Sequence, residues 1–178
     1  MRSPPPFDSA LAAVDYDHPW DRLIGEFKFN ESLDLAGSLA DLLVATHHRH
    51  GAEPRPDWLL PVPMGAGRLR ERGYNQSWEL ARRCARRLGC RTDATLLLRI
   101  KDTPHQLSLP RQHRIANVTG AFAVEPTRRH ELKGCAVTLV DDVMTTQATA
   151  SELTRVVRAA GAVAVHVWVV ARTPAPGR

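Results

Sequence analysis

The sequence predicts an α/β fold with an open, mainly parallel sheet flanked by helices. Residues 136–140 and 163–171 are nearly uninterrupted apolar runs, which is typical of strands buried on both faces. Between them, Leu153, Val156 and Val157 recur at helical spacing. Because a strand–helix–strand order with such strands indicates parallel pairing, we expect one sheet with helices covering its two faces.

The size and composition of the chain are those of one ordinary globular domain. Its 178 residues can bury a sizeable core, and 43% of them are apolar while 24% are charged. No apolar run approaches the ~20 residues that a transmembrane helix needs. The first ten residues lack the basic and apolar segments of a signal peptide, so we expect a cytoplasmic protein.

The first third of the chain contains two further expected elements. Residues 1–20 are rich in proline and are expected to form an extended lead-in. From about Asn30, Leu35 and Leu39 recur at helical spacing, which predicts a helix. Residues 58–63 are an apolar run that ends in prolines, as expected of a buried strand that stops abruptly.

The middle of the chain predicts a loop, a helix and two short strands. Residues 65–73 form a basic segment punctuated by glycines and are expected to be a loop. A helix should follow, capped by Asn75 and ended by Gly89. Its expected apolar face consists of Trp78, Ala81, Ala85 and Leu88, with Arg82, Arg83, Arg86 and Arg87 on the other side. Short strands are expected at 96–100 and 121–124, separated by about twenty residues of poor periodicity.

Positive charge is concentrated in the middle third. Residues 61–120 carry twelve Lys/Arg and four Asp/Glu, a balance of +8, although the net charge of the whole chain is only +5. Such a segment suits a polyanionic ligand, either a phosphorylated sugar or a nucleic acid. Composition alone does not separate these two ligands from a solvated basic face.

The cysteines and histidines favour no metal centre. Cys84, Cys90 and Cys135 lack a CxxC spacing and fit reduced thiols, so no zinc site is expected in this chain. The histidines of the run 47–50 fall near the expected end of a helix, where cations interact favourably with the helix dipole.

The end of the strand at 136–140 carries the residues best suited to chemistry. Asp141 and Asp142 follow this strand, and ligands of open parallel sheets bind beyond the carboxyl ends of the strands. Adjacent carboxylates can accept hydrogen bonds from vicinal hydroxyls or lie near a hydrated Mg²⁺. Thr145, Thr146 and Thr149 then offer hydroxyls at the start of a helix, whose amides form a phosphate cradle. A ligand that has both vicinal hydroxyls and a phosphate, as ribose 5-phosphate does, matches these two groups of residues.

These residues also carry a resemblance to a known family. The segment VTLVDDVMTTQAT (137–149) resembles the phosphoribosyl-pyrophosphate (PRPP) motif of type I phosphoribosyltransferases. Further stretches are similar to those of the competence-protein F (ComF) family: 15–29, which includes Tyr16, Ile24, Lys28 and Phe29, then 59–76, 97–124 and 169–173. The resemblance implies a type I phosphoribosyltransferase-like domain over 31–178, preceded at 1–30 by the lead-in and the start of a family-specific segment.

The resemblance also implies site residues and ligands. Residues that would bind PRPP are Asp141, Asp142, Thr145, Thr146, Gln147, Ala148 and Thr149. A pyrophosphate loop would contain Met64, Gly65, Arg68 and Arg72, the last two within a stretch that continues through Gly73, Asn75 and Gln76. A loop that moves over the site would contain Gln106, Arg111, Arg114 and Asn117. Mg²⁺ would be held through the ligand and water near the two aspartates, with no direct protein ligand.

Two departures from the family pattern change what is expected. Phosphoribosyltransferases have glycine where this chain has Gln147, and a left-handed glutamine costs on the order of 1 kcal/mol. We therefore expect mildly weakened PRPP binding. Many relatives also carry an N-terminal zinc module with four cysteines, whereas this chain has no cysteine before Cys84.

The function expected from the resemblance is PRPP binding by a ComF-type phosphoribosyltransferase-like protein, linked by family to DNA uptake in natural competence. The residues identify neither a general base nor an acceptor, so transferase activity stays open. The alternative is a non-catalytic factor that binds single-stranded DNA or competence proteins, or a PRPP sensor on the same fold. For such binding Tyr74 lies in the basic segment, whereas Trp58 and Trp78 are expected to pack in the core.

Overall fold

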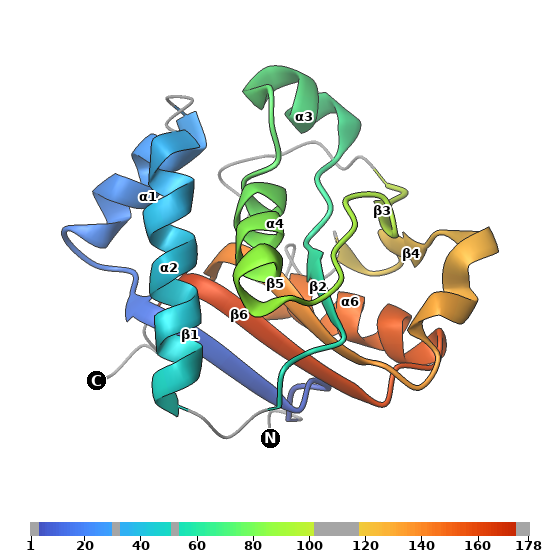
Figure 1. Cartoon of the computed structure of the whole chain (residues 1–178). Coiled ribbons are helices and arrows are strands. Elements are labelled where there is room, and N and C mark those ends of the chain that lie inside the picture. Colours follow the sequence, from blue (N-terminus) through green and yellow to red (C-terminus); the bar gives the residue numbers. More distant parts are fainter. Residues whose placement is uncertain (1–3, 30–32, 51–53, 102–117, 174–178) are drawn as a thin grey trace.

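A four-stranded parallel sheet forms the centre of the molecule (Figure 1). The computed structural model describes residues 4–29, 33–50, 54–101 and 118–173. The strands lie in the order β1–β6–β5–β2 and all three pairings are parallel. Their bounds are β1 (Ser9–Asp15), β2 (Trp58–Pro61), β5 (Ala136–Met144) and β6 (Ala164–Arg172). This architecture confirms the predicted α/β fold and its parallel sheet.

Helices cover both faces of the sheet. One face carries α1 (Trp20–Phe29), α2 (Leu33–His50) and α4 (Gln76–Leu88), and the opposite face carries α6 (Ala148–Ala159). Neighbouring residues of β5 illustrate the division, because Leu139 packs in the cluster that includes α6 while Val140 packs with α1, α2 and α4. Alternate side chains of a strand point to opposite faces, so the continuous apolar runs fill two cores at once.

A small second sheet lies beside the main one. The strands β3 (Leu97–Arg99) and β4 (Phe122–Val124) pair antiparallel, and the 3-10 helix η1 (Pro126–Leu132) follows β4. Leu97 and Phe122 are buried in the same cluster as α6. The strands expected within 96–100 and 121–124 are therefore present, whereas most of the long connection between them lies outside the described residues.

Three segments differ from the sequence-based expectations. Residues 9–15, expected within an extended lead-in, form β1 at the edge of the sheet, where seven residues with three central alanines give little periodic signal. The prediction of a loop over 65–73 is wrong, because Ala66–Arg72 forms the short helix α3. This helix buries none of its residues and so lacks an apolar face that the sequence pattern could indicate. Finally, β5 does not end at the aspartates but continues to Met144, since β6 extends alongside it.

The helix expected after Asn75 is present with its predicted ends. Asn75 caps α4 by accepting a hydrogen bond from the Ser77 backbone N–H, and Gly89 ends it in a left-handed conformation. Its buried face includes Leu80 and Cys84 rather than Trp78, which is only partly buried and lies outside both core clusters. Within the described ranges, no helix is both long enough and apolar enough to span a membrane.

Candidate functional site: the end of strand β5

The candidate site lies where β5 extends beyond its neighbour β2. Pairing between the two strands ends at Pro61 and Val140, and the backbone N–H of Val62 then donates to the Val140 carbonyl at 2.9 Å. Asp141 and Asp142 follow at once, so they lie at the carboxyl end of a central strand, where ligands of open parallel sheets bind. The pair therefore lies beyond the last paired residues of β2, toward the carboxyl end of β5.

The turn from β5 into α6 has a backbone shaped around Gln147. This residue has φ 62° and ψ −1°, the left-handed conformation that the sequence predicted for it, and it is the N-cap of α6. Of the described residues other than glycine, Gln147 alone has positive φ. The turn directs the chain from the strand into the helix, so the first backbone N–H groups of α6, which lack helical partners, face the end of β5.

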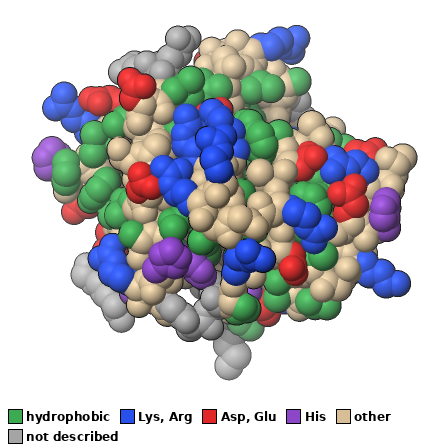
Figure 2. All heavy atoms as spheres, viewed as in Figure 1, with side chains coloured by type: hydrophobic (Ala, Val, Ile, Leu, Met, Phe, Trp, Pro, Cys, Tyr) green, Lys and Arg blue, Asp and Glu red, His purple; other side chains and the backbone are tan. Residues whose placement is uncertain are grey.

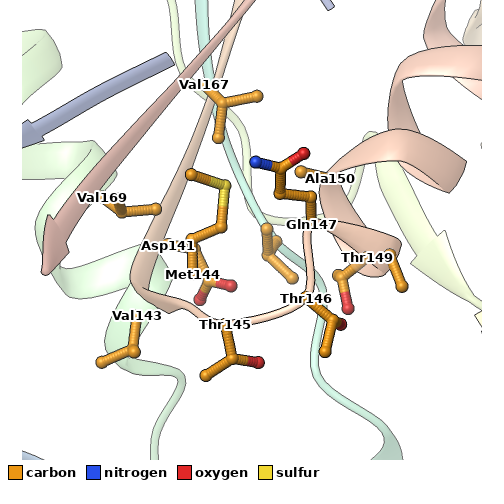
Figure 3. A pocket seen from close by; sticks show the side chains of 12 residues that line it. Asp141, Val143, Met144, Thr145, Thr146, Gln147, Thr149, Ala150, Val167 and Val169 are labelled. Carbon is orange, nitrogen blue, oxygen red and sulfur yellow. The ribbon is translucent and has the colours of Figure 1, made fainter. Parts of the chain in front are cut away.

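A pocket opens between this turn and the sheet. The empty volume of the pocket is about 360 Å³, which includes space open to solvent. The pocket is lined by Val62, Asp141, residues 143–150, Val167 and Val169. Figure 3 shows the Gln147 amide pointing toward Met144 and Val167, while the hydroxyls of Thr145, Thr146 and Thr149 project on the other side of the turn. The Asp141 carboxylate lies on the inner side of the bend. The three hydroxyls therefore lie on a side of the turn that the Gln147 amide does not occupy.

The two aspartates have different partners. The Ser77 hydroxyl donates to Asp141 Oδ1 at 2.8 Å, and the Lys28 ammonium lies 3.3 Å from Asp142 Oδ2. Burial raises the pKa of Asp141 to about 7, with a further increase from the charge of Asp142, against the bonds from Ser77 and the Asp142 backbone N–H. One carboxylate thus accepts a hydrogen bond from a neutral donor, and the other pairs with a cation.

Sequence reasoning assigned no role to Ser77 or Lys28. Lys28 belongs to a stretch that resembles the family, and Ser77 lies one residue beyond another such stretch. Ser77 is 64 residues from Asp141 in the chain, and Lys28 is farther still from Asp142. Only the packing of α1 and α4 on the same face of the sheet brings these side chains to the acid pair.

The segment 72–76 fastens the site to the rest of the fold. Tyr74 Oη donates to the Phe27 carbonyl, and Gln76 Nε2 donates to the Lys28 carbonyl at 3.2 Å, so both bonds hold the end of α1. Asn75 Nδ2 donates to the Val62 carbonyl at 3.1 Å, beside the end of β2. Tyr74 also packs against Phe27 with ring centroids 6.2 Å apart. Tyr74 therefore has a structural role, so it is not the exposed aromatic residue that the nucleic-acid alternative needs for stacking on bases.

The other predicted residues have more varied positions. Met64 and Gly65 connect β2 to α3, which carries Arg68 and Arg72, and none of these four lines the pocket. Burial lowers the pKa of Arg68, followed by the nearby charges of Arg72 and Arg99, while Glu71 and Asp142 oppose the change. Gln106, Arg111, Arg114 and Asn117 lie outside the described residues.

Trp58, Trp78 and the histidine run 47–50 have different environments. Trp58 is 5% exposed in the core, as predicted, and its Nε1 donates to the Glu131 carbonyl. The prediction that Trp78 packs in the core is wrong, because this side chain is only partly buried and lies outside both core clusters. His47 packs against Trp168 with ring centroids 4.6 Å apart, and the described residues contain no group of three or more metal-binding side chains.

Comparison with known proteins identifies the family. No family model matches the chain. The DNA utilization protein YhgH of Salmonella typhi is 33% identical over 176 residues, which cover 97% of this chain and 76% of that protein. Competence protein F of Haemophilus influenzae is 31% identical over 175 residues, with the same coverage. The chain belongs to the competence protein F family.

Solved structures support the fold of this family member. The glutamine PRPP amidotransferase of B. subtilis, solved with ADP and GMP, superposes with a TM-score of 0.53 over 83% of this chain and 30% of that one. The two sequences are 19% identical, so this likeness concerns the fold alone. Together with the relatives, it confirms the resemblance to the competence protein F family and the type I phosphoribosyltransferase-like fold.

Proposed function

We propose that this protein binds PRPP with Mg²⁺ at the end of β5 and acts in DNA utilization, as the names of its relatives suggest for them. The observation that carries the proposal is the turn of residues 145–149. It joins a left-handed residue, three threonine hydroxyls and the N-terminus of α6 shortly after two adjacent carboxylates, with only Val143 and Met144 between. A phosphate cradle beside a pair of acceptors for vicinal hydroxyls matches the two ends of a ribose 5-phosphate.

Each part of the ligand has a matching part of the site. The 5-phosphate would be bound by the N–H groups at the start of α6 and by the hydroxyls of Thr145, Thr146 and Thr149, which Figure 3 shows on one side of the turn. The ribose hydroxyls would donate to Asp141 and Asp142. The turn also includes Gln147 and Ala148, whose backbone surrounds the phosphate in this proposal.

The donor chemistry of the acid pair fits Mg²⁺. Carboxylate oxygens are hard ligands, and Mg²⁺ retains several waters while binding through substrate phosphates and one or two carboxylates. Asp141 and Asp142 would hold the hydrated ion through water and through the ligand. When bound, the ion would supply charge compensation for the diphosphate, and Arg68 and Arg72 on α3 would add positive charge from the side of the protein.

Transfer of the ribosyl group is a narrower proposal than binding. Breaking the bond from the anomeric carbon to the diphosphate requires stabilisation of the negative charge on the leaving group and leaves little covalent chemistry to the protein. The cations described above suit that task. The acceptor of such a transfer is not assigned by the residues of the site, so binding is the activity to test first.

Thermal unfolding with PRPP and Mg²⁺ tests the proposal. Saturating ligand should raise the Tm of the wild-type protein by several degrees, since binding to the native state at a hundredfold excess over Kd adds about 2.7 kcal/mol. The double variant Asp141→Asn, Asp142→Asn should lose this shift. Asp15→Asn, which removes an exposed carboxylate elsewhere, should retain it. A wild-type protein without the shift, or a double variant that retains it, would refute the proposed site.

The alternative of nucleic-acid binding has weaker support from the described contacts. Figure 2 shows Lys and Arg side chains gathered over α4, the helix that carries Arg82, Arg83, Arg86 and Arg87. However, Glu79 accepts hydrogen bonds from both Arg82 and Arg83, and Asp41 pairs with Arg87. These ion pairs offset much of the charge that would attract a phosphate backbone.

A further inference from the structure

Lys28 is directed at the site by the way α1 ends. Its ammonium lies 3.3 Å from Asp142 Oδ2, with only 22% of the lysine side chain exposed. The carbonyl of Lys28 accepts a hydrogen bond from Gln76 Nε2, and the carbonyl before it, of Phe27, accepts one from Tyr74 Oη. Tyr74, just before α4, and Gln76, the first residue of α4, thus fix the last turn of α1, so the position of the ammonium is set by the fold.

The two aspartates have different surroundings. Asp141 lines the pocket at the turn into α6 and accepts a hydrogen bond from Ser77 of α4, whereas Asp142 does not line that pocket and pairs with Lys28 at the end of α1. In PRPP the diphosphate is attached to the anomeric carbon, across the sugar ring from the carbon that bears the 5-phosphate. If the 5-phosphate binds at the α6 turn and the sugar hydroxyls bind at the acid pair, the diphosphate would extend past Asp142 toward Lys28 at the end of α1.

We propose that Lys28 is a ligand-binding residue that contacts the anionic group at the anomeric carbon. The inference rests on the proposed function and adds a specific cation to it. In the ligand-free protein the ammonium pairs with Asp142. When the sugar hydroxyls and hydrated Mg²⁺ approach the acid pair, Asp142 gains other partners, and the ammonium is close enough to bind a diphosphate oxygen instead.

Arg68 supports this assignment of the diphosphate side. It is partly buried on α3 and lies close enough to Asp142 for the two charges to influence each other. The same helix ends at Gly73, immediately before the residues that hold α1. Lys28 of α1 and Arg68 of α3 are therefore both cations close to Asp142.

Calorimetric titration with two ligands tests the role of Lys28. PRPP carries the diphosphate and ribose 5-phosphate lacks it, so their comparison isolates the anomeric group. Lys28→Met should weaken PRPP binding about tenfold or more, because a charge-assisted hydrogen bond is lost. The affinity for ribose 5-phosphate should change no more than about twofold. Lys28→Arg, which keeps the charge, should retain most of the PRPP affinity.

A matched lysine provides the control. Lys133 is exposed just before the start of β5, at the opposite end of that strand from the aspartates, so Lys133→Met should bind both ligands as the wild type does. If Lys28→Met weakens both ligands equally, Lys28 only positions Asp142 and our inference is wrong. If Lys28→Met binds PRPP as the wild type does, it is also wrong. If the wild type binds neither ligand, the proposed function itself fails.

Discussion

Gln147 combines a backbone suited to glycine with a side chain that the turn must accommodate. Its φ of 62° is in the left-handed region, which costs a residue with a Cβ on the order of 1 kcal/mol. Its side chain makes no capping hydrogen bond to α6, and Figure 3 shows its amide turned away from the threonine hydroxyls. The strain is thus not offset by a cap, although the amide leaves the hydroxyl side of the turn open.

Replacing Gln147 by glycine should therefore improve both stability and binding. We expect Gln147→Gly to raise the free energy of unfolding by about 0.5–1 kcal/mol, measured by urea denaturation. PRPP should bind about two- to fivefold more tightly in calorimetry, because the backbone can approach the phosphate without a Cβ. Gln147→Ala keeps the Cβ and should reproduce neither gain. A glycine variant that is less stable or that binds more weakly would show that the side chain serves the site.

At the scale of elements, the junction between α3 and α4 holds the site together. Gly73 ends α3 with φ 80° and donates its N–H to the Leu69 carbonyl. The next four residues then contact the end of α1, the end of β2 and the acid pair. The direction in which the chain leaves α3 therefore decides whether these contacts form.

Gly73→Ala tests this junction without a steric clash. A Cβ at Gly73 would meet nothing within 4 Å, so the cost is that of the left-handed backbone alone. We expect a loss of about 1 kcal/mol in the free energy of unfolding. Gly37→Ala provides the control, because Gly37 is inside α2, also has space for a Cβ, and should become more stable by about 0.5–1 kcal/mol. If Gly73→Ala and Gly37→Ala change the free energy of unfolding by the same amount, the left-handed turn at Gly73 does not have the importance we give it.

The elements that the sequence predicts well are those whose signal is local. The runs at β5 and β6 are continuous and apolar, and α4 has both a capping Asn75 and a terminal Gly89. By contrast, α3 buries no residue and β1 has three alanines among its seven residues, so neither has a distinct hydrophobic period. Long-range partners are harder still, because nothing near Ser77 in the sequence indicates its bond to Asp141.

At the scale of the whole molecule, the basic middle third divides between two regions. One part is on α3 and at the end of β3, where the charges of Arg72, Arg99 and Asp142 all act on Arg68. The other part is on α4, where Glu79 and Asp41 pair with arginines. The composition suited a polyanion but also a solvated basic face, and the fold brings Arg68 close to Asp142. This arrangement suits a small, highly charged anion such as a diphosphate.

The stability of the whole molecule should depend on pH through Asp141. Its pKa is raised in the folded protein to about 7 from an ordinary value of 3.8, so the native state binds its proton more tightly than the unfolded state. The stabilising contribution of the protonated group is complete below about pH 4 and is lost as the pH rises through about 7. Above that pH the native protein bears the cost of a buried charge beside Asp142.

Asp141→Asn removes this charge and should stabilise the ligand-free protein most at high pH. We expect urea denaturation to show a gain on the order of 1–3 kcal/mol at pH 8 and a distinctly smaller one at pH 5. Asp8→Asn is the contrasting control, because a hydrogen bond from the Val165 backbone N–H lowers the pKa of Asp8, so its loss should destabilise the protein at both pH values. A gain at Asp141 that is the same at pH 5 and pH 8 would contradict the raised pKa. If Asp141→Asn gains stability only at high pH and also binds PRPP more weakly, the protein retains a destabilising carboxylate because ligand binding requires it.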